Sequence, residues 1–247
     1  VAIVRAGLDG AISWQTRIGG GGGERVHTVV PVGDRYFLGG TSGSFGGAWG
    51  VWFGADGEVI TQTSLVDPDG SDLSSAAADG NNAVVIAGDL DLGIDAAAWI
   101  ARVDIDGGVA WQNRLDGGQL AIEGVARTED GYVIVGQTLQ WVQGEFGDLD
   151  LFAAGFAEDG SLRWQKAIGM VDELDRASGV VGLPGGGSVV VGNTRSFGAG
   201  DHDIWVIRLD AAGGIVWQQT IGTAASDVPD GVARTPDGIA IAGRTAA

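Results

Sequence analysis

The sequence predicts an all-β protein, a five-bladed β-propeller with four antiparallel strands in each blade. Three observations lead to this prediction. A Trp-Gln or Thr-Gln pair recurs five times, at steps of 47, 50, 53 and 53 residues. A glycine-containing turn precedes each pair, and a further apolar hairpin separates one pair from the next. A period of about 40–50 residues that holds four short strands is typical of a propeller blade.

The outer hairpin of the unit is clearest in residues 201–222, where two apolar runs flank the turn from Asp210 to Gly214. The recurring pairs begin at Trp14, Thr61, Trp111, Trp164 and Trp217. Twelve residues before the first residue of each pair lie Ala2, Trp49, Trp99, Phe152 and Trp205, so four of the five copies have an aromatic residue at this position. Because large aromatic side chains recur in register, we expect them to pack one blade against the next.

The inner hairpin of the unit precedes the outer one. Its five copies are residues 24–41, 74–90, 123–138, 177–194 and 231–243. An Asp-Gly turn between apolar runs is a strong hairpin signal. Runs such as residues 189–191, Val-Val-Val, are apolar on both faces, which suits a sheet covered by a neighbouring sheet on each side.

The two ends of the chain each hold half of a unit. The chain has 14 residues up to Trp14 and 30 residues after Trp217, and their sum of 44 is close to one period. The N-terminal strand pair is therefore predicted to complete the C-terminal blade, so that residues 1–247 form a single domain. Closing the ring would hide the edge strands that otherwise promote aggregation.

The composition excludes several classes of function. The net charge is −18, from 32 acidic and 14 basic residues, so nucleic acid and anionic membrane surfaces are poor partners. The chain has no cysteine, which excludes disulfides and thiol catalysis. No run of about 18 apolar residues is present, so no membrane insertion is expected.

Residues 185–222, GGGSVVVGNTRSFGAGDHDIWVIRLDAAGGIVWQQTIG, resemble the β-propeller repeats of secreted and surface proteins of bacteria and archaea, of the delta-60 and SBBP type. The resemblance extends over all five units, although the unit at 42–90 has Thr61 in place of tryptophan. It implies a propeller fold and an extracellular or cell-surface location. It implies no catalytic residues, because function resides in sites and not in the fold.

Binding is expected on the face that carries the longer, more varied loops. On this face the sequence places Trp141 in the longest loop and three phenylalanines in the sister loops, namely Phe45, Phe146 and Phe197. Together they are predicted to form an aromatic platform for a sugar ring. The alternative is that the phenylalanines cover the ends of the blades.

Acidic residues gather in the connections between blades. The candidate metal ligands are Asp67, Asp69, Asp72, Asp172, Asp175, Asp227 and Asp230. Calcium takes six to eight oxygen ligands, and clustered aspartates on loops can supply them. The alternative is structural, since aspartate side chains also accept backbone N–H bonds and stabilise turns. No cofactor is certain, and calcium is the candidate.

Two further sets of residues are expected to belong to the scaffold. Five acids are predicted to ring one mouth of the central channel, namely Glu24, Asp72, Glu123, Asp175 and Asp230. Five glutamines are predicted to be buried and bonded to the backbone, namely Gln15, Gln62, Gln112, Gln165 and Gln218.

These observations favour a non-catalytic, extracellular binding or interaction module that takes a glycan or a protein on the long-loop face. The alternative is a structural or assembly component of a cell surface or larger complex. A glycosidase-like enzyme ranks third. His27 and His202 have no matched nucleophile at a recognisable spacing, and the acids repeat with the fold instead of marking one unusual position.

Overall fold

The structure is a computed structural model that describes residues 1–19, 23–43, 47–65, 71–90, 96–116, 118–142, 145–170 and 173–246; the side chains of residues 139–148 lie outside the description. Twenty strands account for the regular structure of this part of the chain. None of the described residues belongs to a helix with the length and apolarity needed to cross a membrane.

Four sheets of four strands make up the body of the molecule. The first comprises β3 (Arg25–Val32), β4 (Arg35–Ser42), β5 (Gly47–Phe53) and β6 (Val59–Ser64). The second comprises β7 (Ser71–Asp79), β8 (Ala83–Leu90), β9 (Ala97–Asp104) and β10 (Val109–Leu115). The third comprises β11 (Gln119–Thr128), β12 (Gly131–Val142), β13 (Glu145–Ala157) and β14 (Leu162–Ile168). The fourth comprises β15 (Asp175–Gly182), β16 (Ser188–Thr194), β17 (Asp203–Leu209) and β18 (Ile215–Ile221).

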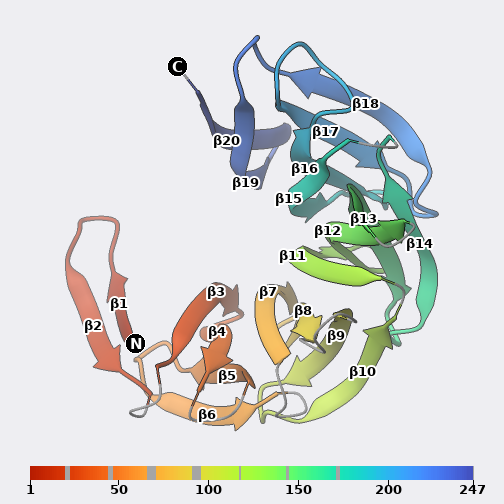
Figure 1. Ribbon diagram of the computed structural model, residues 1–247. Helices are drawn as coiled ribbons and strands as arrows, with labels where there is room; N and C mark the ends of the chain where they lie inside the picture. Colours follow the sequence, from red (N-terminus) through yellow and green to blue (C-terminus); the bar gives the residue numbers. More distant parts are fainter. Residues whose placement is uncertain are drawn as a thin grey trace.

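Each of these sheets is a blade whose strands follow the chain from the axis outward. Neighbouring strands pair in sequence order and are antiparallel. In Figure 1 the first strands, β3, β7, β11 and β15, surround the centre, whereas the last strands, β6, β10, β14 and β18, lie on the perimeter. The predicted all-β propeller with four antiparallel strands per blade is confirmed. We number these blades 1 to 4 in chain order.

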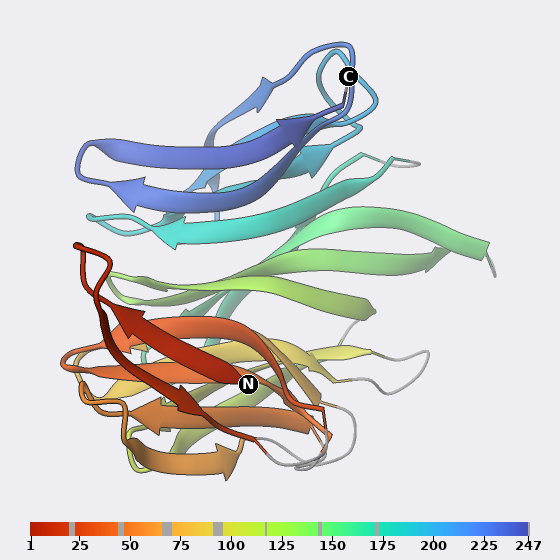
Figure 2. The same cartoon turned by 90° about the vertical axis from the view of Figure 1, so that its left-hand side faces the viewer.

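The remaining four strands are those of a fifth blade, and they form two separate sheets. The N-terminal pair is β1 (Ala2–Ala6) with β2 (Ile12–Arg17), and the C-terminal pair is β19 (Asp227–Thr235) with β20 (Gly238–Thr245). The division into an inner and an outer pair is as predicted. The two pairs are not hydrogen-bonded to each other in this structure, and Figures 1 and 2 show them at the two ends of an open arc.

The core lies between blades. One cluster joins blades 2 and 3 through Val85, Ile100, Ile122 and Ile134, all at most 2% exposed. Equivalent clusters join blades 1 and 2 and blades 3 and 4. Strands β5 and β16 are buried along their whole length, which confirms that the central strands are apolar on both faces because a blade covers each side.

A column of glycines allows the first two strands of each unit to approach closely. A Cβ atom at the glycine would overlap a carbonyl oxygen of the first strand, which carries a register shift at the same level. The glycines are Gly40, Gly88, Gly136, Gly192 and Gly243. Only glycine fits where two backbones are this close.

Three tryptophans of the outermost strands hold neighbouring blades together. In each case the indole N–H donates to a backbone carbonyl in the outer-hairpin turn of the next blade. The bonds run from Trp14 to Ala55 (2.8 Å), from Trp111 to Glu158 (3.1 Å) and from Trp164 to Ala211 (3.1 Å). Trp49 and Trp205 are fully buried within the blades. The predicted packing between blades is confirmed for Trp14, Trp111 and Trp164, whereas Trp217, predicted to pack in the same way, is 42% exposed.

The prediction for the glutamines is wrong. Gln15, Gln62, Gln112, Gln165 and Gln218 are all exposed. They alternate with the tryptophans on the outermost strand of each blade, so their side chains point to the face that the next blade does not cover. The outermost strand thus contributes only one of its faces to the interior.

Candidate functional site

The predicted aromatic platform divides between described and undescribed residues. Phe45 lies outside the described residues, as do the side chains of Trp141 and Phe146. The backbone places Trp141 opposite Phe146 as a cross-strand pair in β12 and β13, so Trp141 lies in an extended hairpin and not in a loop as predicted. Figure 2 shows this green hairpin projecting from the loop face. Phe197 packs on Trp205 with ring centroids 5.3 Å apart, as the alternative of covering the blade end requires.

The predicted metal ligands occupy dissimilar surroundings. Asp67, Asp69 and Asp172 lie outside the described residues. Asp72 accepts a hydrogen bond from the Thr41 hydroxyl at 2.9 Å, and Asp230 pairs with Arg244 at 2.9 Å. Among the residues that the structure describes, no three His, Asp or Glu side chains lie close enough to hold a metal ion.

Two of these aspartates instead hold the connections between blades in shape. Asp175 is fully buried and accepts bonds from the Met170 N–H at 3.3 Å and from the Ser196 hydroxyl. Asp227 accepts the Thr223 N–H at 2.7 Å, and this bond lowers the pKa of the Asp227 carboxyl. Turn formation, the alternative to metal binding, accounts for these contacts.

The five acids predicted to ring the channel do not occupy equivalent positions. The glycine column provides a common register, since it pairs with Val26, Leu73, Ile122, Ala177 and Pro229. Counted from these partners, Glu24 and Asp175 lie two residues before, Asp72 one before, and Glu123 and Asp230 one after. The bulge in the first strand separates these positions, so the carboxylates do not form a symmetric ring.

Three acids of two neighbouring blades nevertheless meet at the loop end of the axis. They line an open hollow of about 780 Å³. Its lining comprises Arg25, Val26 and His27 from β3, Asp72 and Ser74 from β7, Asp89 from β8, and Ile122 and Glu123 from β11. Blades 1, 2 and 3 therefore all contribute to the hollow. Its side chains are basic on β3 and acidic on β7, β8 and β11.

Asp89 is the most perturbed group of this hollow. Its carboxylate accepts the Ile122 N–H at 2.6 Å, which connects blade 2 to blade 3. Burial raises the pKa of Asp89 to about 7, and Glu123 and Asp72 add to the effect by charge repulsion. Partial burial also raises the pKa of Glu123, which Arg176 opposes. The hollow can accept a cationic group, which would relieve the repulsion.

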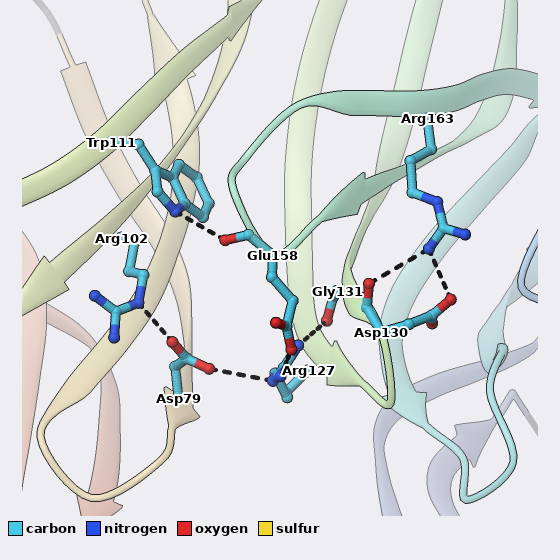
Figure 3. Close-up of polar contacts among 8 residues, drawn as sticks. All are labelled: Asp79, Arg102, Trp111, Arg127, Asp130, Gly131, Glu158 and Arg163. Carbon is cyan, nitrogen blue, oxygen red and sulfur yellow. Dashed lines mark hydrogen bonds and ion pairs between the residues drawn. The ribbon is translucent and has the colours of Figure 1, made fainter.

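The opposite face, formed by the short turns, carries an ion-pair network that sequence analysis missed. Asp79 lies between two guanidinium groups, at 2.6 Å from Arg102 and 3.1 Å from Arg127, and Arg127 also pairs with Glu158 (Figure 3). Arg127 lies 5.0 Å above the Tyr132 ring. Burial, together with Asp79, raises the pKa of Tyr132 to about 12.

This network connects blade 2, which supplies Asp79 and Arg102, to blade 3, which supplies Arg127 and Glu158. A separate pair, Arg163 with Asp130 at 2.8 Å, stays within blade 3 (Figure 3). The sequence offers one signal of the network, because Arg102 shares its repeat position with Arg5 and Arg208. Its geometry is that of a contact between blades, since every member already has a charged partner.

Comparison with known proteins supports the fold. No protein-family model matches the chain, and no curated protein matches it. The WD40 domain of Neurospora crassa Pan2 is similar in structure, with a TM-score of 0.62, 14% identity, and coverage of 97% of this chain and 66% of that one. A variant of Synechocystis apocarotenoid oxygenase has a TM-score of 0.54 and 12% identity, over 98% of this chain and 60% of that one.

The chain thus spans less than two thirds of each of these neighbours. WD40 domains are β-propellers, so the similarity agrees with the blade arrangement described above. At these identities the similarity concerns the fold alone.

Proposed function

We propose that the chain is a non-catalytic binding module, placed outside the cell or on its surface, that binds a basic segment of a protein at the long-loop face. The observation that supports this proposal is the hollow at the loop end of the axis, where Asp72, Asp89 and Glu123 surround an open polar space. Assignment to the delta-60 and SBBP-type repeats is part of the same proposal.

The physical basis is charge. A net charge of −18 attracts cationic partners over long range. Within the hollow, Asp89 has lost part of its hydration, so a lysine or arginine side chain beside it would stabilise the ionised carboxylate. A neutral glycan would bring no such compensation, which is why a protein ligand ranks before a glycan.

The test uses three fluorescent peptides of equal length as probes, one rich in lysine, one rich in glutamate and one neutral. Only the lysine-rich peptide is expected to bind, and its affinity should rise between pH 6 and pH 8 as Asp89 ionises. Asp89→Asn should weaken binding about tenfold. Asp130→Asn, an equal change of charge on the opposite face, serves as the matched control and should leave binding unchanged.

Equal binding of all three peptides, or equal effects of the two variants, would exclude the hollow as the binding site. A glycan array, run with and without calcium, covers the second ligand class. A glycan that binds only with calcium, and loses binding in Asp72→Asn, would replace the basic segment as the ligand.

A structural or assembly component is the second candidate function. One observation favours it: β1 and β20 lack a partner on one side, whereas their equivalents in blades 1 to 4 are interior strands that pair on both sides. An unpaired strand edge is a template for pairing with another chain.

A further inference from the structure

The junctions between blades repeat one contact, in which an outermost strand docks on the outer-hairpin turn of the next blade. The indole donates to the turn as described above, and the ring occupies the space over the turn glycine. A Cβ on Gly57 would lie 2.6 Å from the Trp14 ring, and one on Gly213 would lie 2.6 Å from the Trp164 ring. Glycine is therefore required both for the turn and for seating the ring.

A second donor, two residues after the tryptophan, completes the contact. The Asn113 side chain donates to the Gly160 carbonyl at 2.5 Å, and the Lys166 ammonium donates to the Gly213 carbonyl. The turns at Gly160 and Gly213 thus each receive two hydrogen bonds and one aromatic ring from the preceding blade. The contact has a docking half, the strand, and a receiving half, the turn.

The C-terminal end of the arc presents an unused docking half. Strand β18 is exposed along its whole length, whereas the equivalent β14 is half-buried at Trp164, Lys166 and Ile168. Trp217 is 42% exposed. Within the described part of the chain, neither Trp217 nor Gln219 makes a hydrogen bond through its side chain, although they occupy the positions of Trp164 and Lys166.

The N-terminal end presents an unused receiving half. The turn of the β1–β2 hairpin contains Leu8 and Gly10, the counterparts of Ala211 and Gly213 in blade 4. Gly10 has φ +81°, close to the +75° of Gly213, so the turn has the same shape. No atom of the residues that the structure describes lies within 4 Å of a Cβ placed on Gly10, and Leu8 is fully exposed.

The free strand edges of the two ends are complementary as well. In each complete blade, the glycine of the column on the second strand lies opposite the aromatic residue of the third strand, as Gly192 lies opposite Trp205 and Gly88 opposite Trp99. Gly243 and Ala2 occupy these positions in the two terminal pairs. The same register would place Ile241 opposite Val4.

We propose that the C-terminal end of one copy of this chain binds the N-terminal hairpin of a second copy. Strand β20 pairs with β1 of the second copy, and Trp217 lies over its Gly10 and donates to the Leu8 carbonyl. The proposal rests on the second candidate function and is independent of the hollow, so either can fail without the other.

A second copy is the partner because the two halves lie at opposite ends of one arc and do not meet within it (Figures 1 and 2). The contact is heterologous, since the two ends differ, and it leaves one docking half and one receiving half free in every assembly that does not close. Two chains of charge −18 repel each other. Association is therefore expected to strengthen as salt screens this repulsion.

The test is disulfide trapping. The chain has no native cysteine, so the introduced thiols can form disulfides only with each other. One sample of the chain carries Val4→Cys and a second carries Ile241→Cys. When the two are mixed under mild oxidation at 0.5 M salt, about half or more of the protein is expected to form a linked pair of chains. Arg5→Cys replaces Val4→Cys as the control, because a shift of one residue turns the side chain to the opposite face of the sheet.

A third sample carries Val4→Cys and Ile241→Cys in the same chain. A linked single chain as the main product at every concentration would show that the ends join within one copy, and it would overturn the proposal. Equal linking of the control and the matched pair would overturn it too, as would the absence of linking at high concentration.

Two variants test the aromatic contact by light scattering over a concentration series. Trp217→Ala is expected to weaken association about 30-fold, as loss of a central aromatic contact at an interface does. Gly10→Ala should weaken association similarly, because the added methyl group occupies the space over the turn that the Trp217 ring would fill. Gly80→Ala is the matched control: Gly80 has φ +69° and equally free surroundings, but it lies in a turn away from both ends. Unchanged association in Trp217→Ala would contradict the proposal.

Discussion

The two faces of the propeller differ in whether equivalent residues of successive blades make the same contacts. On the short-turn face the same contact recurs from blade to blade, with a tryptophan over a turn glycine and a backbone carbonyl as acceptor. On the loop face, residues that look alike in sequence have unlike partners: Asp175 holds a connection between blades, Asp230 pairs with an arginine, and Asp89 lines an open hollow.

This difference separates scaffold from candidate site. Contacts that recur with the period stabilise the junctions between blades, and each junction adds its own share to the stability of the fold. Contacts that occur once, such as those of Asp89, add nothing that the fold needs in every blade. If this distinction holds, substitutions on the short-turn face should change stability, and substitutions in the hollow should change charge-dependent behaviour.

The largest effect is expected for Trp164→Ala on the short-turn face. The change removes a half-buried indole together with its bond to Ala211, and the expected loss in the free energy of unfolding is about 4 kcal/mol. Urea denaturation of dilute protein measures it. Trp217→Ala is the matched control in the same repeat position, and its loss should be below about 1 kcal/mol because no turn lies beneath it. Similar losses in both variants would show that the contact of Trp164 with the turn of the next blade does not stabilise the fold.

The next largest effect concerns Asp89 and depends on pH. The pKa of its carboxyl is about 7 in the folded chain and near 4 in the unfolded chain, so the folded state binds the proton more tightly. The contribution of Asp89 to the free energy of unfolding is therefore fully present below about pH 4. It falls as the pH rises to 7 and stays low above that pH.

Asp89→Asn keeps an acceptor for the Ile122 N–H but cannot ionise. Relative to the parent chain, the variant should gain about 3 kcal/mol between pH 4.5 and pH 8. Urea denaturation at a series of pH values, at constant ionic strength, provides the measurement. A constant difference across this range would show that Asp89 does not titrate as described.

A smaller effect is expected for Asp79→Asn in the ion-pair network. The change leaves Arg102 and Arg127 beside each other without their shared carboxylate, at an expected cost of about 2 kcal/mol because the site is only partly exposed. Asp130→Asn removes the exposed pair with Arg163 and should cost less than about 0.5 kcal/mol. Thermal melting of the two variants side by side decides whether the network stabilises the junction of blades 2 and 3.

The smallest effect, and the only gain, is expected at the junction of blades 1 and 2. There Thr61 replaces the tryptophan, and its methyl carbon lies 3.6 Å from a Cβ placed on Gly107. Thr61→Trp should fill the seat and stabilise the chain by about 1 kcal/mol. Gln62→Trp is the control and should give no gain, because Gln62 is exposed on the opposite face of the strand. A loss in Thr61→Trp would show that this junction has closed around the smaller side chain.

The sequence predicted the blades because the period, the turn glycines and the paired apolar runs are all local signals. It also identified the tryptophans that connect blades, since they recur in register. It failed for the five glutamines, because alternation with tryptophan shows which face a residue takes but not whether a neighbour covers that face. The separation of the terminal pairs could not be predicted either, because strand edges that match in sequence still have to meet in space.

The candidate site was predicted only in part. Asp72 and Glu123 were predicted as acids of the loop face, but the bulge in each first strand shifts them by one or more positions, and no sequence pattern marked it. Arg25 and His27 were not grouped with them, because they come from a different blade. The Asp79 network joins residues 79 and 158 across two blades, a sequence distance at which only the fold brings charges together.

The glycine column sets limits on how this gene can diverge. A duplicated unit can lose a seated aromatic residue, as residue 61 illustrates, and it can gain or lose residues in its connections, as the steps of 47 to 53 residues show. It cannot exchange Gly88, Gly136 or Gly192, because any side chain would displace the backbone of the adjoining strand. In a saturation mutagenesis library selected for folded protein, these codons should be the most restricted in every copy, and they would still align the units after all other similarity between them had been lost.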